Sequence, residues 1–448
     1  MGERGLKILK FGGTSVGSSQ ALRLASSIIQ AELPAGGVVV VSALSGTTDQ
    51  LLKAIAAAGK GDDGSARGIA LAIRERHLQV AEELGLALKA DWTPLFERLS
   101  NLLEGMGLVW ETSPRAKDAV LALGETLSAK LLVALLKTEG LQARFEDARG
   151  VILTDARHGK ARPSPEAIRG AAQAWRPSLA GGDILVTQGF LGTGPDGTTT
   201  TLGRGGSDTS ATLLGEALDA AEVQIWTDVD GVLTADPSLV AAARPIPVMS
   251  LREAAALSSF GAKVLHADSL APVERSGFKL VVANTHRPEA SRTEILARAP
   301  QRPEGSITSV AYKEGLVCLH FPPARDLDAV FQTATELQEA GAARYGLLGT
   351  PEGSLLVVRP EHPDSIAMLE TLQRSGLRVD AGWAVVALVG EGLRSCPGEA
   401  LTLLASLSGE SIGGILAGGA GISVAFLVPE QRLKDLIPSL HRICIEKV

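Results

Sequence analysis

Apolar runs rich in β-branched residues, separated by helical patterns, constrain the fold of this chain more than any other feature. Near-continuous hydrophobic strands that alternate with helices are typical of a mainly parallel sheet covered on both faces. Such sheets bind their ligands beyond the carboxyl ends of the strands. The runs are KILKF (7–11), GVVVVSAL (37–44), DILVTQGFL (183–191), VQIWTDV (223–229) and KLVVANT (279–285).

The rest of the chain divides into three further parts. Residues 60–118 are charged, helical in pattern and poor in strands, which predicts a helical excursion from the sheet domain. A stretch with several Pro and Arg residues, 287–305, is typical of a linker. After it, strand and helix patterns recur twice at β-α-β spacing, which predicts two small α+β units.

Composition excludes several classes of protein. A length of 448 residues is enough for two or three domains, and a net charge of −7 argues against a nucleic-acid or anionic-membrane surface. Cys318, Cys396 and Cys444 are too scattered for a disulfide framework or a zinc site, so a reducing cytosol is expected. The uncharged stretch 411–428 is long enough to span a bilayer. Its glycines and strand-like alternation predict instead a buried loop followed by a strand.

The segment KFGGTS at 10–15, after the first predicted strand, has the composition of an anion-binding turn. Backbone N–H groups at Gly12 and Gly13 can approach a phosphate closely, and a helix starting next would add the positive end of its dipole. Lys10 precedes the glycines, whereas the Walker A lysine follows them. From the incoming strand, Lys10 can reach outer phosphates as a fixed point charge. A tight turn with a surface lysine is the alternative.

A second glycine-rich segment, TTTTLGRGGSDTSA at 198–211, precedes a helical pattern. Ser207 and Asp208 can cap that helix. Capping does not explain Arg204 in the same turn, and arginine is suited to bidentate capture of a carboxylate. Just upstream, GTGPDG (192–197) matches GxGxxG, but no helix follows it. We expect the tip of a hairpin there.

Two later segments have the composition of a nucleotide site. IWTDVDGVLTADP (225–237) runs from a strand into a loop whose acids lack the spacing of an EF-hand, so a strand-end loop that holds a nucleotide fits better. In SSFGAKVLHADSL (258–270), Lys263 is either a second lysine directed at phosphates or a solvated helix lysine. His266 is expected to be structural.

In chain order, six segments resemble the aspartokinases: KFGGTSV (10–16), VSALSGTT (41–48), LGETLSAKLL (123–132), TTTLGRGGSD (199–208), WTDVDGVLTADP (226–237) and FGAKVLH (260–266). The resemblance covers roughly 1–297 and implies the carbamate-kinase-like amino-acid-kinase fold, an α/β fold with a mainly parallel sheet covered by helices. The C-terminal part, 306–448, resembles tandem ACT (ferredoxin-like) regulatory domains, the first formed by 316–382 and the second by 306–315 plus 383–448. The helical excursion resembles that of the homo-oligomeric branch that responds to lysine or threonine.

The resemblance implies an activity: ATP-dependent phosphorylation of the side-chain carboxylate of L-aspartate to 4-phospho-L-aspartate, the first step of the pathway to lysine, threonine and methionine. It implies that Mg²⁺ arrives on ATP and is not held by protein side chains. It also implies a cytoplasmic homodimer that associates through its ACT domains and binds neither nucleic acid nor membrane. Two alternatives stay open: the same fold with another acidic amino acid as acceptor, such as glutamate or acetylglutamate, and a catalytically decayed ACT sensor.

The resemblance also implies residue roles. Asp208 would position the catalytic lysines, Arg204 would hold the α-carboxylate of aspartate, and Glu125 would pair with its α-ammonium. The sequence departs from the usual family pattern at Leu233 and Ser238, both in the nucleotide region, and at Ala267-Asp268. In full, the implied catalytic residues are Lys10, Asp208 and Lys263, the implied ATP-binding residues are Lys10, Phe11, Gly12, Gly13, Thr227, Asp228, Lys263 and Val264, and the implied aspartate-binding residues are Thr48, Glu125 and Arg204.

Overall fold

The computed structural model describes residues 5–87, 92–261, 265–298, 302–323, 327–350, 352–394, 413–417 and 421–446. The chain divides into two compact units. Unit 1 comprises Met1–Val232, Pro247–Leu251 and Val264–Ala299, and unit 2 comprises Leu233–Ile246, Arg252–Lys263 and Pro300–Val448. Two segments that precede residue 264 in the sequence therefore belong to the C-terminal unit.

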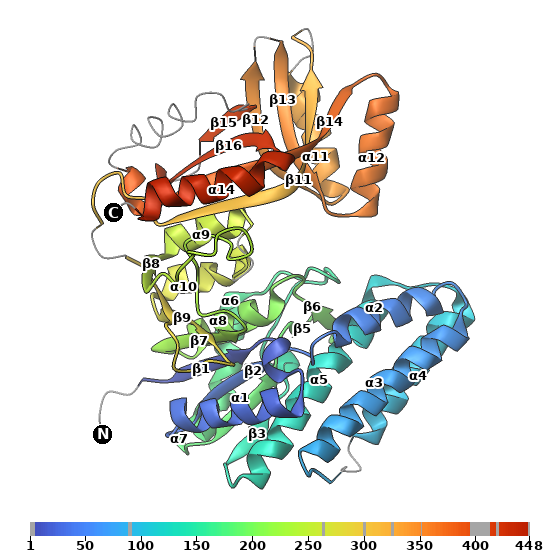
Figure 1. The fold of residues 1–448 in the computed structure, drawn as a ribbon. Helices are drawn as coiled ribbons and strands as arrows, with labels where there is room; N and C mark the ends of the chain where they lie inside the picture. Colours follow the sequence, from blue (N-terminus) through green and yellow to red (C-terminus); the bar gives the residue numbers. More distant parts are fainter. Residues whose placement is uncertain are drawn as a thin grey trace. The chain divides into compact units, whose positions relative to one another are not determined.

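Unit 1 is built on an eight-stranded sheet with the order β3-β4-β2-β1-β7-β9-β10-β8 (Figure 1). The first six strands of this order are parallel, β10 is antiparallel to β9, and β8 is parallel to β10. The predicted strands and the mainly parallel sheet are thus confirmed. The bounds are β1 Lys7–Phe11, β2 Gly37–Val41, β3 Ala143–Phe145, β4 Ile184–Gln188, β7 Glu222–Thr227, β8 Val248–Ser250, β9 Lys279–Asn284 and β10 Thr293–Leu296.

The stretch 287–305, which we predicted to be a linker, contains β10. Thr293 and Ile295 are fully buried in this strand, whereas the residues that alternate with them are half-buried. Alternate β-branched residues are typical of a half-buried strand. The prediction was wrong because the Pro and Arg residues on both sides of TEIL obscured this short pattern.

The helices of unit 1 pack on the sheet. α1 (Ser19–Glu32) and α5 (Pro114–Thr138) share a core with Leu9 and Phe11 of β1. α5 is the one helix among the described residues that is long and apolar enough to cross a membrane, and 83% of its most apolar stretch is buried inside the protein. Its composition is therefore that of a core helix. The remaining helices of unit 1 are α6 Pro165–Ala172, α7 Arg176–Ala180, α8 Gly206–Ala217 and α10 Ala271–Ser276, whereas α9 (Leu251–Ser259) belongs to unit 2 from Arg252 on.

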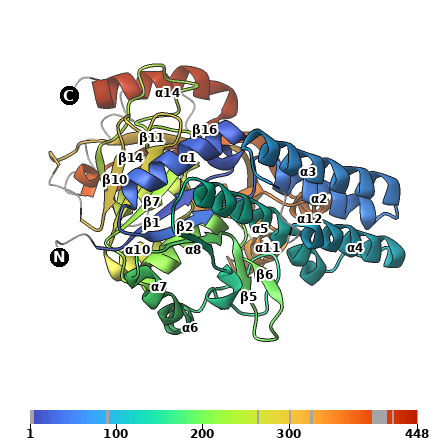
Figure 2. The same ribbon diagram turned by 90° about the horizontal axis from the view of Figure 1, so that it is seen from below.

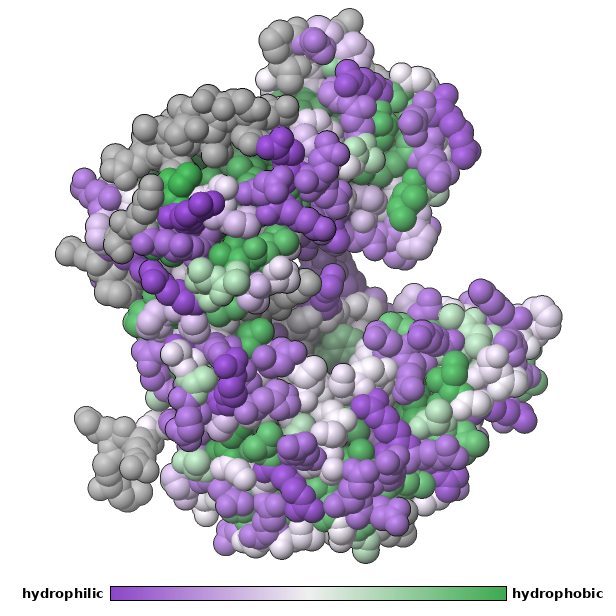
Figure 3. Space-filling view, in the orientation of Figure 1, coloured by the Kyte–Doolittle hydropathy of each residue, from purple (hydrophilic) through white to green (hydrophobic). Residues whose placement is uncertain are grey.

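The helical excursion predicted for 60–118 is confirmed over the residues described there. α3 (Asp63–Glu83) and α4 (Thr93–Val109) lie side by side and extend away from the sheet together with α2 (Thr47–Ala58) (Figure 2). These helices enclose a small core of their own, which includes Leu51, Ile73 and Leu99. On the face drawn in Figure 3, hydrophilic and hydrophobic residues of unit 1 are interspersed, as is usual for a surface exposed to water.

Unit 2 contains a six-stranded sheet with the order β12-β13-β11-β14-β16-β15, in which every pair is antiparallel. The predicted α+β architecture of the C-terminal part is confirmed. Two strands are long: residues 317–321 of β11 pair with β13 on one side, and on the other side 316–320 pair with 378–383 of β14 and 309–313 with 385–389 of β14. The bounds are β11 Ser309–Phe321, β12 Ala342–Thr350, β13 Gly353–Pro360, β14 Arg378–Val389, β15 Gly414–Ala417, β16 Ser423–Pro429, α11 Leu327–Glu339, α12 Pro363–Arg374 and α14 Leu433–His441.

Within the glycine-rich stretch 411–428, residues 414–417 form a strand where we predicted a buried loop. Gly414–Ala417 is β15 and pairs antiparallel with β16. The second half of the stretch is the predicted strand, β16. Glycine weakens a strand without preventing its backbone from pairing, so composition alone predicted a loop here.

Candidate active site

A cleft of about 540 Å³ lies at the carboxyl ends of β1, β2 and β7 in unit 1. Segments that follow these strands line it, together with α5 and the turn before α8. This is the sheet edge where the strand pattern placed a ligand site. Of the residues implied by the resemblance, Lys10, Gly12, Gly13, Thr48, Glu125, Arg204, Asp208, Thr227 and Asp228 line the cleft.

Lys10 is fixed in the cleft by an ion pair. Because side chains alternate along a strand, Lys10 points to the face opposite Leu9 and Phe11. Its Nζ lies 2.7 Å from Oδ1 of Asp208, in the first turn of α8, and only 8% of the Lys10 residue is exposed. The cation is therefore held in one place at the edge of the sheet.

The glycines after β1 allow close contact between strand ends. Gly12 N–H donates to the carbonyl of Trp226 at 3.0 Å. A Cβ atom at Gly13 would lie 3.1 Å from the carbonyl oxygen of Ala43. A side chain there would push apart the segments after β1 and β2, which together form the floor of the cleft.

The helix start that we predicted directly after KFGGTS does not lie at the cleft. Residues 14–16 form a short 3-10 turn, and α1 begins only at Ser19, where Ser18 Oγ accepts from Ala21 N–H at 3.2 Å. The helix N-termini that line the cleft are those of α2 and α8, after Gly46 and Gly205. Both glycines have positive φ, 78° and 72°. The backbone N–H groups of the first turn and the helix dipoles at these two ends suit an anion.

Side-chain capping of α8 by Ser207 or Asp208, the alternative role for these two residues, is not observed. The N-cap is Gly205, and both side chains lie within the first turn. A Cβ atom at Gly205 would clash with the Cβ of His266, so the turn needs a glycine at this position. His266 itself is structural, as predicted, because its side chain accepts from Asp268 N–H at the start of a short 3-10 helix.

Arg204 lies at the tip of this turn. Its side chain is exposed and lines the cleft. Within the part of the chain that the structure describes, it forms no ion pair and is available to an anionic ligand. The turn follows a hairpin of β5 (Leu191–Thr193) and β6 (Thr199–Thr201), which confirms that GTGPDG is a hairpin tip.

Glu125 reaches the cleft from α5. A Cβ atom at Gly124 would lie 3.0 Å from Ala43 Cβ, so this glycine lets α5 approach the loop after β2. Only 4% of Glu125 is exposed. Burial raises the pKa of the Glu125 carboxyl to about 7, partly opposed by hydrogen bonds with the backbone of Glu125 and Ala43. Its Oε2 has no hydrogen-bond partner among the described residues. A buried carboxyl with an unsatisfied oxygen beside a cleft suits a ligand ammonium.

Thr227 and Asp228 lie at the end of β7. Thr227 Oγ1 donates to Asp228 Oδ1 at 3.2 Å. The loop is held from β9, since Asn284 Nδ2 donates to the carbonyl of Asp228 at 3.3 Å and to Asp230 Oδ1 at 2.7 Å. Phe11 does not line the cleft, because its ring is buried and stacks on Trp226 with centroids 6.2 Å apart. Lys263 and Val264 lie outside the described residues.

Sequence reasoning missed three residues around the cleft. Phe190 lines it with a φ of 70°, an uncommon backbone conformation for an aromatic residue. The glycines beside it, in QGFLG, were the available signal. Arg76 of α3 donates to the carbonyls of Ser45 and Gly17 and so ties the helical excursion to the loops after β1 and β2. No local pattern marks Arg76 or Asn284, because their partners are distant in the sequence.

Comparison with known proteins gives consistent matches. The amino acid kinase family matches residues 5–284. Lysine-sensitive aspartokinase 3 of Escherichia coli (strain K12) is 32% identical over 453 residues, which cover 97% of this chain and 98% of that protein. Aspartokinase 1, chloroplastic, of Arabidopsis thaliana is 30% identical, with 99% and 81% covered.

Solved structures are similar over nearly the whole chain. The crystal structure of E. coli aspartokinase III in complex with aspartate and ADP (R-state) has a TM-score of 0.83 at 31% identity and covers 97% of this chain and 99% of that one. The structure of the same E. coli enzyme with lysine and aspartate (T-state) has a TM-score of 0.80 at 31% identity, with 98% and 99% covered.

Proposed function

The chain belongs to the aspartokinases of the amino acid kinase family, and from this premise we propose how its cleft phosphorylates aspartate. The enzyme is an aspartate kinase that transfers the γ-phosphoryl group of ATP to the side-chain carboxylate of L-aspartate, giving 4-phospho-L-aspartate. The observation that supports the site is the Lys10–Asp208 ion pair, which lies in the same cleft as Arg204 and the buried Glu125.

The chemistry needs charge stabilisation and no general base. The side-chain carboxylate of aspartate is already ionised near pH 7 and can attack the phosphorus directly. Catalysis then depends on aligning the two substrates and stabilising the charge on the transferring phosphoryl group. The ammonium of Lys10 and the N-terminal N–H groups of α2 and α8 are the donors that this cleft offers.

We assign aspartate and ATP to opposite sides of Lys10 within the cleft. Arg204 would bind the α-carboxylate of aspartate in a bidentate manner, Glu125 its α-ammonium, and Thr48 would add a hydroxyl contact. Gly12, Gly13, Thr227 and Asp228 would contact ATP. For Phe11, Lys263 and Val264 the roles implied by the resemblance stay predictions, and a contact from Phe11 would have to come from its backbone.

Mg²⁺ is proposed to enter the site on ATP. This ion keeps several waters and usually binds substrate phosphates together with one or two carboxylates. The free, buried thiols of Cys318 and Cys444 support the proposed cytoplasmic location, since a reducing compartment keeps thiols free.

A side-by-side assay with three acceptors tests the function. Purified protein is incubated with Mg²⁺ and ATP and with L-aspartate, L-glutamate or N-acetyl-L-glutamate, and ADP release is measured. We expect turnover with aspartate and at most background with the other two. Preferred turnover of glutamate or acetylglutamate would contradict the assignment of aspartate as the acceptor. A folded protein that is inactive with all three acceptors would contradict the proposed kinase activity.

The raised pKa of Glu125 predicts a pH dependence of aspartate binding. The α-ammonium of aspartate needs the ionised carboxylate, and below about pH 7 the Glu125 carboxyl of the free enzyme is protonated. We therefore expect kcat/KM for aspartate to fall by up to ~10-fold per pH unit below that value. The measurement is kcat/KM from pH 5.5 to 8.5, with KM for ATP as the internal comparison.

The same group makes the stability of the free enzyme depend on pH. Since the pKa rises from 4.5 to about 7 on folding, the folded state binds the proton more tightly, and stability falls as pH rises between these values. The loss amounts to about 3 kcal/mol at most. Glu125→Gln, which does not titrate, should lose this pH dependence in denaturant unfolding followed from pH 5 to 8. An unchanged dependence in Glu125→Gln would contradict the raised pKa.

A homodimer that associates through the C-terminal unit is the proposed assembly. The adjacent helices α11 and α12 expose Leu327, Phe331 and Ile366, each about half accessible, and exposed apolar residues favour association. We expect light scattering at micromolar concentration to give twice the chain mass of 46.4 kDa. Phe331→Asp should weaken the dimer, whereas Leu71→Asp, at a similarly exposed position of α3, should not. A monomeric wild type would contradict the proposal.

A further inference from the structure

Asp118 is a buried acid on α5 that the chemistry described above does not use. Only 1% of it is exposed. It lies seven residues before Glu125, so both side chains share one face of the helix, about 10 Å apart along its axis. The start of α5 is fixed by Ser113, whose Oγ accepts from Ala116 N–H at 3.2 Å. A buried carboxyl at this defined position needs partners to compensate for lost hydration.

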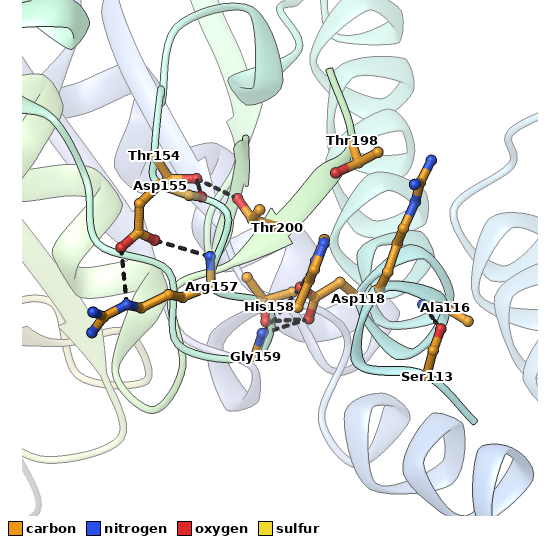
Figure 4. A network of polar contacts seen from close by, with 12 residues as sticks. Ser113, Ala116, Asp118, Thr154, Asp155, Arg157, His158, Gly159, Thr198 and Thr200 are labelled. Carbon is orange, nitrogen blue, oxygen red and sulfur yellow. Dashed lines mark hydrogen bonds and ion pairs between the residues drawn. The ribbon is translucent and has the colours of Figure 1, made fainter. Parts of the chain in front are cut away.

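Three donors surround the Asp118 carboxyl. Its Oδ2 lies 2.8 Å from Nδ1 of His158, and both of its oxygens accept from Gly159 N–H, at 3.0 and 3.2 Å (Figure 4). Thr201 Oγ1 donates to Oδ1 at 2.7 Å. The carboxyl thus joins α5 to the loop at 158–159 and to the last residue of β6.

These two segments support the turn that presents Arg204. Ala161 N–H donates to the carbonyl of Thr201 at 2.9 Å, so the loop and β6 are also joined through their backbones. Gly203, with a φ of 78°, packs against the loop so closely that a Cβ atom would lie 3.2 Å from the carbonyl oxygen of Gly159. Arg204 follows directly, three residues after Thr201.

We propose that Asp118 is a positioning residue for aspartate binding, which acts through Thr201 and Gly159 to fix the turn that carries Arg204. Asp118 does not line the cleft and so does not contact the substrate. An arginine binds a carboxylate tightly only when the turn that carries the arginine has a single conformation. A displacement of the guanidinium by about 1 Å is enough to weaken a binding site strongly. The inference rests on the proposed function, because it takes Arg204 to be the ligand of the α-carboxylate.

Neighbouring threonines of β6 supply a matched test. Thr201 and Thr200 are both buried, and each donates or accepts one side-chain hydrogen bond of 2.7 Å, but Thr200 bonds to Thr154 and not to Asp118 (Figure 4). Thr201→Val and Thr200→Val therefore remove equivalent hydroxyls from adjacent positions. Thr201→Val should raise KM for aspartate by roughly 5- to 30-fold, with kcat and KM for ATP within about threefold of wild type. Thr200→Val should leave KM for aspartate unchanged within about twofold.

Asp118→Asn is the second variant and is used in the same way should Thr201→Val fail to fold. The amide group would face the Gly159 N–H, which donates to both oxygens of the native carboxyl. We expect the same selective rise in KM for aspartate, and Thr201→Ser, which keeps the hydroxyl, should behave as wild type. Melting temperatures are measured for every variant.

The pattern of KM values decides the proposal. A rise for aspartate in Thr201→Val or Asp118→Asn that Thr200→Val does not share supports it. Equal KM values for aspartate in the two valine variants, or a rise for ATP as large as that for aspartate, would overturn it. Either of those results leaves wild-type turnover of aspartate intact, whereas failure of the proposed function would appear as wild-type protein without such turnover.

Discussion

Replacing Lys10 by Ala is expected to lower kcat by at least ~100-fold, the scale of losing one preorganised donor to the transition state. The ammonium is 2.7 Å from Asp208 and only 10% of the Lys10 side chain is exposed, so the charge is held in one buried position. An electrostatic contribution of this kind is strong because the buried lysine is shielded from most of the screening solvent. The measurement is kcat with saturating ATP and aspartate, together with circular dichroism and thermal unfolding of the variant.

Two companion variants separate charge from packing. Lys10→Met keeps most of the aliphatic stem and should lose as much activity as Lys10→Ala. Lys7→Ala removes a lysine of the same strand that pairs with Glu32 at 2.8 Å, away from the residues that line the cleft, and should keep near-normal kcat. A folded Lys10→Met protein that retained kcat within about threefold of wild type would contradict the role of Lys10.

Long buried strands could be predicted from the sequence because their burial leaves a local pattern. All five residues of GVVVV in β2 are buried, and an uninterrupted apolar run is the pattern of a strand covered on both faces. β3 (ARF) and β8 (VMS) have three residues each. Three residues are too few to show a periodicity. The strand conformation of these segments comes from pairing with neighbouring strands, which the local sequence does not reveal.

The division of the chain into units could be predicted only in part. The change of pattern near residue 300 marked the C-terminal sheet, but 233–246 and 252–263 belong to unit 2 as well. Their attachment is long-range: Tyr312 Oη donates to Asp236 Oδ2 at 3.1 Å, and Thr308 Oγ1 donates to Glu253 Oε1 at 2.6 Å. No local composition encodes such contacts. The pairing of 309–313 with 385–389 supports the predicted division into two ACT domains, which stays a prediction.

For the candidate site, motifs located residues better than they located local geometry. Lys10, Glu125 and Asp208 come from segments far apart in the sequence and line one cleft. The predicted helix start directly after KFGGTS was wrong, and the alternative of side-chain caps for α8 is not observed. Both depended on where a helix begins, which is decided here by a 3-10 turn and by the positive φ of Gly205. Residues such as Arg76 act through distant backbone carbonyls and leave no motif.

Replacing Arg204 by Ala is expected to lower kcat/KM for aspartate by roughly 2–4 kcal/mol, or about 30- to 700-fold, with little change in KM for ATP. Without the guanidinium, the α-carboxylate would enter the cleft without a charged partner. The exposed side chain supports no described ion pair, so its removal should leave the folded structure and its melting temperature nearly unchanged. Steady-state kinetics with each substrate varied in turn, at saturation of the other, measures both effects.

Arg204→Lys and Arg157→Ala make the assignment specific. Lysine keeps the charge but cannot form the planar, bidentate pair with a carboxylate, so an intermediate loss of kcat/KM for aspartate is expected. Arg157 is exposed in the neighbouring loop and pairs with Asp155 at 3.5 Å outside the cleft, so its removal changes the surface charge equally without touching the substrate. Arg157→Ala should therefore retain wild-type kinetics. If Arg204→Ala weakened ATP more than aspartate, the guanidinium would belong to the nucleotide side, and the acceptor end of the cleft would have to be reassigned to Glu125 and Thr48 alone.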